Sequence, residues 1–172
     1  MTDLLGWAVE NATGRKLAQL ISELLWQPLG VESDADLTVD SEGSARAAGG
    51  LCVTVRDLAR VGVLLTQQDT SPVPQAWLQD MLTGGDTEKF ARGAFAPAFE
   101  GLMSRPAYRD CWIADAETET LCAMGVFGQN LWVDRKNQVV VAKMSSQETG
   151  QDVGRTTTSL RGYREVARLL AE

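Results

Sequence analysis

The stretch Gly125–Asp134, with the sequence GVFGQNLWVD, decides the fold of this 172-residue chain. With the preceding Leu121-Cys122-Ala123-Met124, it is typical of a buried strand, a glycine-flanked crossing point and a second strand that ends in a turn. Glycines on both sides of Val126-Phe127 remove side-chain bulk where the backbone approaches another group closely. From spacing alone, a β-bulge or tight hairpin in an ordinary sheet explains the same glycines more often than a ligand site does.

The sequence around this stretch predicts an antiparallel meander. Strand candidates lie at about 108–114, 119–127, 129–134 and 138–145, and turn residues separate them at 115–118 and 134–137. The run Val139-Val140-Val141 predicts a central strand that is buried on both faces. A helix at about 157–171 follows the strands.

The first half of the chain is predicted to be mainly helical. Apolar residues at helical spacing favour two consecutive helices within 3–30, the first capped by Asp3 or Thr2 and ended by Gly14. A loop with one short strand is expected over 31–50, and Thr54 with Asp57 predicts the start of a further helix. Pro72 to Pro74 leads into a short helix that Gly84-Gly85 ends. Residues 86–107 show no sustained period, which predicts a long surface loop.

Composition excludes several classes of partner. The net charge of −7 argues against nucleic acid and anionic membrane, both of which require a positive surface. No apolar run reaches about 18 residues and no signal peptide is visible, so a cytoplasmic protein is expected. The odd number of cysteines, Cys52, Cys111 and Cys122 in apolar surroundings, favours free buried thiols in a reducing compartment. Without histidine, neither a Ser-His-Asp triad nor a histidine-ligated zinc site is available, and no metal or other cofactor is expected.

Three segments together resemble the serine β-lactamase-related, penicillin-binding-protein-like hydrolases, specifically their 6-aminohexanoate-dimer hydrolase and esterase branch. The stretch at 125–132 is similar to the strand G-[IV]-H-G-Q-N-L-[WY] that lines the catalytic cleft of that family. The segment GGLCVTVRDLAR at 49–60 is a second match. Residues 2–30 resemble the family segment that follows the catalytic tyrosine.

The resemblance implies an α/β (α+β) fold in which helices flank an antiparallel sheet, with a C-terminal helix. We expect one domain over 1–172, mainly helical over 1–85 and formed by strands and the final helix over 108–172. It assigns the backbone N–H of Val126 as an oxyanion donor in acyl transfer. The substrate-facing residues that it implies are Gly125, Phe127, Gly128, Gln129, Ala48 and Gly49. Phe127 stands where the family has histidine, and Ala48 stands where the aminohexanoate hydrolases have asparagine.

The nucleophile of that family does not occur in these residues. Lys16, Lys89, Lys136 and Lys143 are the four lysines, and none has a serine three positions earlier. The formal analogue Thr13-Gly14-Arg15-Lys16 is interpreted as the boundary between two helices. Neither Tyr108 nor Tyr163 is followed by the Tyr-x-Asn or Tyr-x-Ser pattern of the family.

Three hypotheses follow from this absence. The chain is the C-terminal part of an amide or ester hydrolase that is inactive alone, a half-enzyme that complements a separate chain, or a non-catalytic binding module. The expected partners are a small amide or ester substrate when an N-terminal half completes the site, and self-association or a complementary chain. β-Lactams, short esters and ω-amino-acid oligomers all stay open as substrates.

Overall fold

The computed structural model describes residues 1–67 and 72–171. It divides into two compact units, Met1–Arg60 and a second that begins at Val61. The division falls within one helix, and each unit is described by itself below.

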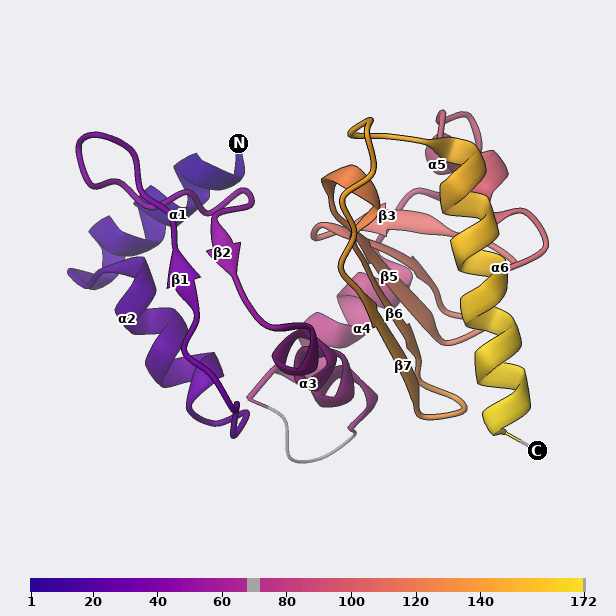
Figure 1. Cartoon of the computed structure of the whole chain (residues 1–172), viewed down its shortest axis with the longest axis horizontal. Helices are drawn as coiled ribbons and strands as arrows, with labels where there is room; N and C mark the ends of the chain where they lie inside the picture. The colour runs from indigo at the N-terminus through magenta and orange to yellow at the C-terminus, as the bar shows by residue number, and fades with distance from the viewer. Residues whose placement is uncertain (68–71, 172) are drawn as a thin grey trace. The chain divides into compact units, whose positions relative to one another are not determined.

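The first unit consists of helices, a two-stranded sheet and the beginning of a further helix (Figure 1). Its elements are α1 (Thr2–Thr13), α2 (Leu17–Ile21), a π-helical continuation η1 (Ser22–Trp26), and the antiparallel strands β1 (Asp36–Leu37) and β2 (Leu51–Cys52). Gly14 ends α1 as predicted, in the left-handed conformation with φ 68°. The predicted cap is wrong, because Met1 occupies the N-cap position and the Asp3 carboxylate instead accepts the N–H of Ala48 at 2.8 Å.

Helix α3 (Val55–Thr66) starts as the sequence predicts. The Thr54 hydroxyl accepts the N–H of Asp57 at 3.1 Å and donates back to the Asp57 carboxylate at 2.8 Å. Asp57 is fully buried and also accepts the N–H of Glu32 at 2.9 Å and a guanidinium N–H of Arg60 at 2.8 Å. The N–H of Glu32 is the main cause that holds the pKa of the Asp57 carboxyl below its usual range. Asp57 therefore joins the loop before β1 to the first turn of α3.

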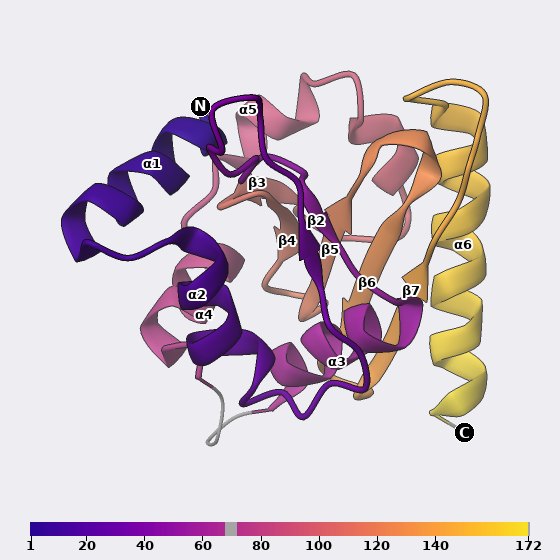
Figure 2. The ribbon, with the colours of Figure 1, turned by 60° about the vertical axis from the view of Figure 1, so that its left-hand side comes forward.

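The second unit is built on the predicted antiparallel meander (Figure 2). The strands β3 (Ala107–Arg109), β4 (Trp112–Asp115), β5 (Thr120–Met124), β6 (Asn130–Asp134) and β7 (Val139–Lys143) follow one another in that order across the sheet. The candidate strand 108–114 is in fact a hairpin, because Asp110 and Cys111 adopt positive φ values of 50° and 69°. The prediction of a central strand at 139–141 is also wrong. β7 has β6 as its single neighbour among the described strands, and Val140 and Val141 are half-buried.

Helices cover both faces of this sheet. Ile113, Cys122 and Trp132 share one face by register, and they pack under Leu160 of α6 (Val153–Leu170) and Phe99 of the 3₁₀ helix η2 (Ala96–Phe99). On the opposite face, Val140 and Leu131 lie against Gly62 in the second half of α3. α4 (Gln75–Thr83) contacts β3 and β4.

The segment 86–107 differs from its prediction as a surface loop. It contains α5 (Thr87–Ala91), which the Asp86 carboxylate caps by accepting the N–H of Lys89 at 2.9 Å, and then η2. Phe99 is completely buried in the core under α6. Two short helices of five and four residues leave no helical period long enough to recognise in the sequence.

Candidate functional site

The β5–β6 connection is a tight turn at the end of the predicted buried strand. β5 ends at Met124, which pairs with Asn130, and the N–H of Gly125 donates to the carbonyl of Gln129 at 2.8 Å. Phe127 and Gly128 both adopt left-handed conformations, with φ 59° and 82°. A side chain costs about 1–3 kcal/mol in such a conformation, so Phe127 is strained. The prediction that the strand continues to residue 127 is therefore wrong by three residues.

The loop before α6 holds this turn in place. The N–H of Phe127 donates to the carbonyl of Gly150 at 3.0 Å, and the N–H of Gln147 donates to the carbonyl of Phe127 at 3.1 Å. A Cβ on Gly128 would displace the flexible end of the Gln147 side chain, so the positive φ is the main reason that this position favours glycine. These bonds hold the turn, but the N–H of Val126 itself has no acceptor in the part of the chain that the structure describes. Val126 is 57% exposed.

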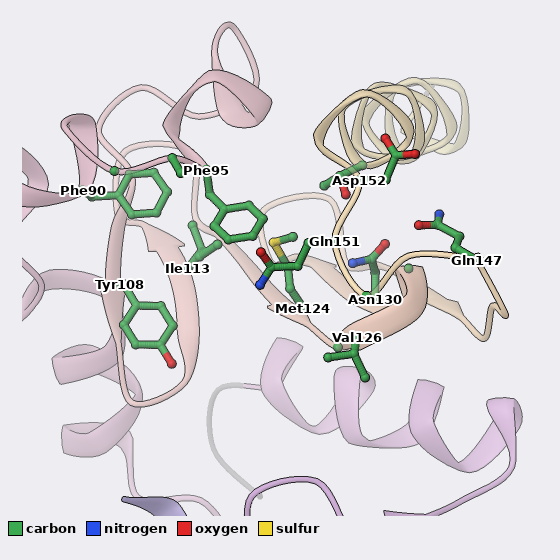
Figure 3. Close-up of a pocket in the computed structure, with 16 residues that line it drawn as sticks. Phe90, Phe95, Tyr108, Ile113, Met124, Val126, Asn130, Gln147, Gln151 and Asp152 are labelled. Atoms are coloured by element: carbon green, nitrogen blue, oxygen red, sulfur yellow. The ribbon is translucent and has the colours of Figure 1, made fainter.

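A pocket of about 340 Å³ opens beside Val126 and lies wholly within the second unit. Sheet register explains one wall, because Tyr108, Ile113, Met124 and Asn130 lie on the same face. Phe90 of α5 and Phe95 of the following segment complete an apolar wall. Figure 3 shows Phe90, Phe95 and Ile113 on one side and Asn130, Gln147 and Asp152 on the other. An apolar chamber with a few polar groups at one end is the usual form of a small-molecule site.

The polar end of the pocket is fixed by hydrogen bonds to α6. Asn130 is buried, and its Oδ1 accepts the hydroxyl of Tyr163 at 3.1 Å. Asp152 caps α6 by accepting the N–H of Arg155 at 2.9 Å, and its other oxygen lies 3.3 Å from the Arg155 guanidinium. Burial raises the pKa of the Tyr163 hydroxyl, which therefore stays protonated as a donor at neutral pH.

Three of the predicted site residues line this pocket, two neighbours on the same turn do not, and two others belong to the first unit. Gly125, Val126 and Gly128 line the pocket. Phe127 and Gln129 do not; Phe127 is partly exposed, and the Gln129 side chain donates to the carbonyl of Val126 at 3.5 Å. Ala48 and Gly49 belong to the first unit, where the N–H of Gly49 donates to the carbonyl of Arg46 at 3.5 Å.

The aromatic wall and Gln147 are pocket residues that the sequence analysis missed. Phe90 and Phe95 lie in the segment predicted as a loop. Gln147 reaches the pocket because its loop folds back onto a turn 20 residues earlier, and no local pattern reports such a contact. The Asp86-x-x-Lys89 cap was the one local signal for α5, and with it for the position of Phe90.

Among the described residues, one hydrogen bond joins a lysine to a serine side chain, and it is not part of a Ser-x-x-Lys motif. The Lys143 ammonium on β7 donates to the Ser159 hydroxyl on α6 at 3.0 Å, which joins the edge strand to the helix. Thr13 is the last residue of α1 and donates to the carbonyl of Val9 at 2.7 Å, and α2 begins at Leu17, so the segment is a helix boundary as interpreted.

The three cysteines do not line the pocket. Cys122 is buried, and burial raises the pKa of its thiol to about 12, whereas Cys52 and Cys111 are exposed. The prediction of three buried thiols is thus wrong for two of them. Residues 1–67 and 72–171 contain no cluster of metal-ligating side chains and no helix with the length and apolarity to cross a membrane.

Comparison with known proteins identifies the class to which this fold and pocket belong. A family model described as Beta-lactamase matches residues 1–163, and the chain is a member of that family. Within the family it is similar to the 6-aminohexanoate-dimer hydrolase of Paenarthrobacter ureafaciens, with 37% identity over 150 residues that make up 84% of this chain and 37% of the relative.

A solved structure supports the same assignment. The putative 6-aminohexanoate-dimer hydrolase from Bacillus anthracis superposes with a TM-score of 0.79 and 26% identity, over 98% of this chain and 42% of that one. The predicted family and the predicted fold class are both confirmed. The chain spans less than half the length of either relative.

Proposed function

We propose that this chain is the part of a serine hydrolase that binds the acyl group of an amide or ester and supplies one oxyanion donor. The reaction is acyl transfer: a serine attacks the carbonyl, a lysine and a tyrosine manage its proton, and water releases the acyl group. Residues outside these 172 provide the Ser-x-x-Lys and tyrosine in this proposal. The hydrolases that match this chain in sequence and in structure support it.

The observation that carries the proposal is the unpaired N–H of Val126 beside an apolar pocket. Oxyanion stabilisation requires an N–H donor that is held still and has no partner before the substrate arrives. The bonds of Phe127 to Gly150 and Gln147 supply that rigidity.

A chimera tests the proposal. Residues 1–172 replace the matched part of the Paenarthrobacter ureafaciens hydrolase, whose other residues provide the rest of the enzyme. We expect the chimera to hydrolyse nitrophenyl esters, nitrocefin or the aminohexanoate dimer, and the isolated chain to hydrolyse none of them. A folded chimera that hydrolyses none of the three would favour the second candidate, a non-catalytic binding module. The apolar pocket is the feature that such a module would use.

A further inference from the structure

Asn130 places an unused hydrogen-bond donor at the polar end of the pocket. The residue is 4% exposed and its Oδ1 accepts the Tyr163 hydroxyl, but its Nδ2 has no acceptor among the described residues. Over that same part of the chain, the fully buried side-chain atoms without a partner are the Trp132 indole N–H and Gln147 Oε1. Asn130 Nδ2 therefore keeps accessible surface, and it does so in the pocket that the residue lines. Figure 3 shows this nitrogen on the side of Met124.

A polar cluster between the sheet and α6 surrounds the other end of this amide. Asn130 and Lys143 are directly opposite each other in the register of β6 and β7, so they lie on the same face of the sheet. Ser159 and Tyr163 are four residues apart on α6, which places them on one side of that helix. The Lys143 ammonium donates to the Ser159 hydroxyl at 3.0 Å. The Tyr163 hydroxyl lies 3.1 Å from Asn130 Oδ1.

The lysine sets the direction of the hydrogen bonds in this cluster. An ammonium group only donates, so the Ser159 hydroxyl accepts from Lys143 and keeps its own hydrogen for Tyr163. Burial raises the pKa of the Tyr163 hydroxyl, and the hydrogen bond from Ser159 opposes that rise, as a donor does. Tyr163 then uses its own hydrogen to donate to Asn130 Oδ1. The amide of Asn130 is thus held with Oδ1 toward α6 and Nδ2 toward the pocket.

Thr156 is a second buried polar residue of the pocket with an unused group. It is 7% exposed, and its hydroxyl has no partner in the part of the chain that the structure describes. The hydroxyls of Thr157 and Thr158 instead donate to the carbonyls four residues earlier. Buried polar groups usually have a partner, so two unpaired groups in one pocket indicate a ligand that carries polar atoms.

We infer that Asn130 is a specificity-determining residue, which donates from Nδ2 to a neutral oxygen acceptor on an otherwise apolar ligand. Tyr163, Ser159 and Lys143 act through Asn130 as positioning residues. The apolar wall of the pocket takes the aromatic or alkyl part of that ligand. Asp152 is the one charged residue among the described residues that line the pocket, so a carboxylate would bring a second negative charge there. The inference goes beyond the proposed function, because the pocket binds such a ligand whether or not acyl transfer follows.

Three probes of similar shape test this inference by their binding to the intact chain. 4-Phenylbutan-2-one carries a ketone, 2-methyl-4-phenylbut-1-ene has a methylene group in place of the ketone oxygen, and 3-phenylpropanoate carries a carboxylate. Two-dimensional ¹H–¹⁵N NMR gives the dissociation constants and the positions of the side-chain NH₂ signals of Asn130. We expect the ketone to shift one of these signals downfield relative to its position with the hydrocarbon. We expect the carboxylate to bind more weakly than the ketone.

Variants of the cluster separate donation from positioning. Asn130→Leu removes the donor at similar size, so the affinity for the ketone relative to the hydrocarbon should fall about threefold to tenfold, as loss of one neutral hydrogen bond does. Tyr163→Phe and Lys143→Met remove hydrogen bonds that orient the amide and should lower the same ratio, with the affinity for the hydrocarbon unchanged. Lys136→Met, at an exposed position outside the pocket, is the matched control for Lys143→Met and should retain the ratio.

The NMR measurement on the parent chain decides the role of Asn130 even when a variant does not fold. A ketone that does not bind, or that leaves the Asn130 NH₂ signals where the hydrocarbon leaves them, would overturn that role. A ratio lowered by Asn130→Leu but by neither Tyr163→Phe nor Lys143→Met would overturn the positioning residues. A carboxylate that binds as tightly as the ketone would overturn the neutral ligand class. None of these outcomes depends on the Val126 N–H, so the chimera tests the proposed function separately.

Discussion

At the scale of single residues, the turn at 126–128 was predictable in its position but not in its conformation. Two flanking glycines marked the turn and placed Val126 on it. The sequence did not show that Phe127 would take a positive φ, because a non-glycine residue in that conformation depends on the bonds to Gly150 and Gln147. Gln147 was not predicted as a pocket residue for the same reason, because its position depends on the contact between its loop and the turn.

The variant Gly128→Ala should destabilise the protein by about 1–3 kcal/mol, because alanine is strained at φ 82°. Urea unfolding followed by circular dichroism measures the change. Gly162→Ala is the matched control, since Gly162 lies within α6 with open space around its Cβ position. That control should stabilise the protein by about 0.5–1 kcal/mol. Equal effects of the two variants would contradict the strained turn.

At the scale of elements, the long periodic segments were predictable and the short ones were not. Strand candidates separated by turn residues predicted the meander, and glycine and proline predicted the end of α1 and the bounds of α4. The two short helices within 86–107 were missed because tertiary packing of Phe99, rather than local pattern, holds them. The run Val139-Val140-Val141 predicted a doubly buried strand, but the described sheet ends at β7.

Substitutions on helix α6 test how tightly the helix packs on the core of the second unit. Leu160 is fully buried between α6, η2 and the sheet, so Leu160→Ala should cost about 2–5 kcal/mol. Leu169 on the same helix is 55% exposed, and Leu169→Ala should change stability by less than about 0.5 kcal/mol. Chemical denaturation of both variants measures the difference. A loss for Leu169→Ala as large as that for Leu160→Ala would contradict the packing of α6.

The buried carboxylate of Asp57 predicts a dependence of stability on pH. Its pKa is lowered from the usual 3.8, so its ionised form stabilises the fold above that pH, and the contribution disappears as the pH falls through the lowered folded-state pKa. Asp57→Asn should therefore be less stable than the parent protein at pH 7, with a gap that narrows toward pH 3. Urea midpoints at a series of pH values measure the gap. A gap that stays constant with pH would show that ionisation of Asp57 is not the cause.

At the scale of the whole molecule, exposed apolar residues indicate association. Leu4, Leu5 and Trp7 of α1 are each about 60% exposed. Exposed apolar side chains and an open sheet edge both favour contacts with another chain. Because the chain matches 37% and 42% of its two relatives, we propose that the remaining part of a hydrolase covers such surfaces in a complete enzyme.

We predict that the isolated chain self-associates in a concentration-dependent manner and binds an apolar dye. Light scattering after size-exclusion chromatography measures the first, and dye fluorescence the second. The double variant Leu5→Glu/Trp7→Glu should weaken both, because charge replaces apolar surface on α1. Gln79→Glu, at an exposed position on α4, adds charge outside α1 and serves as the control. A monomer at every concentration without dye binding would contradict the prediction.

The central claim is that the Val126 backbone N–H, and not its side chain, acts on the substrate. In the active chimera, Val126→Ile keeps the N–H and should leave kcat/KM nearly unchanged. Val126→Pro removes the N–H and should lower kcat by about 10²–10³-fold, as loss of one oxyanion donor does. The decisive measurement is the ratio of kcat for these two variants, with circular dichroism to show that each is folded. A folded Val126→Pro chimera that retains the rate of Val126→Ile would show that this turn is scaffold rather than catalytic site.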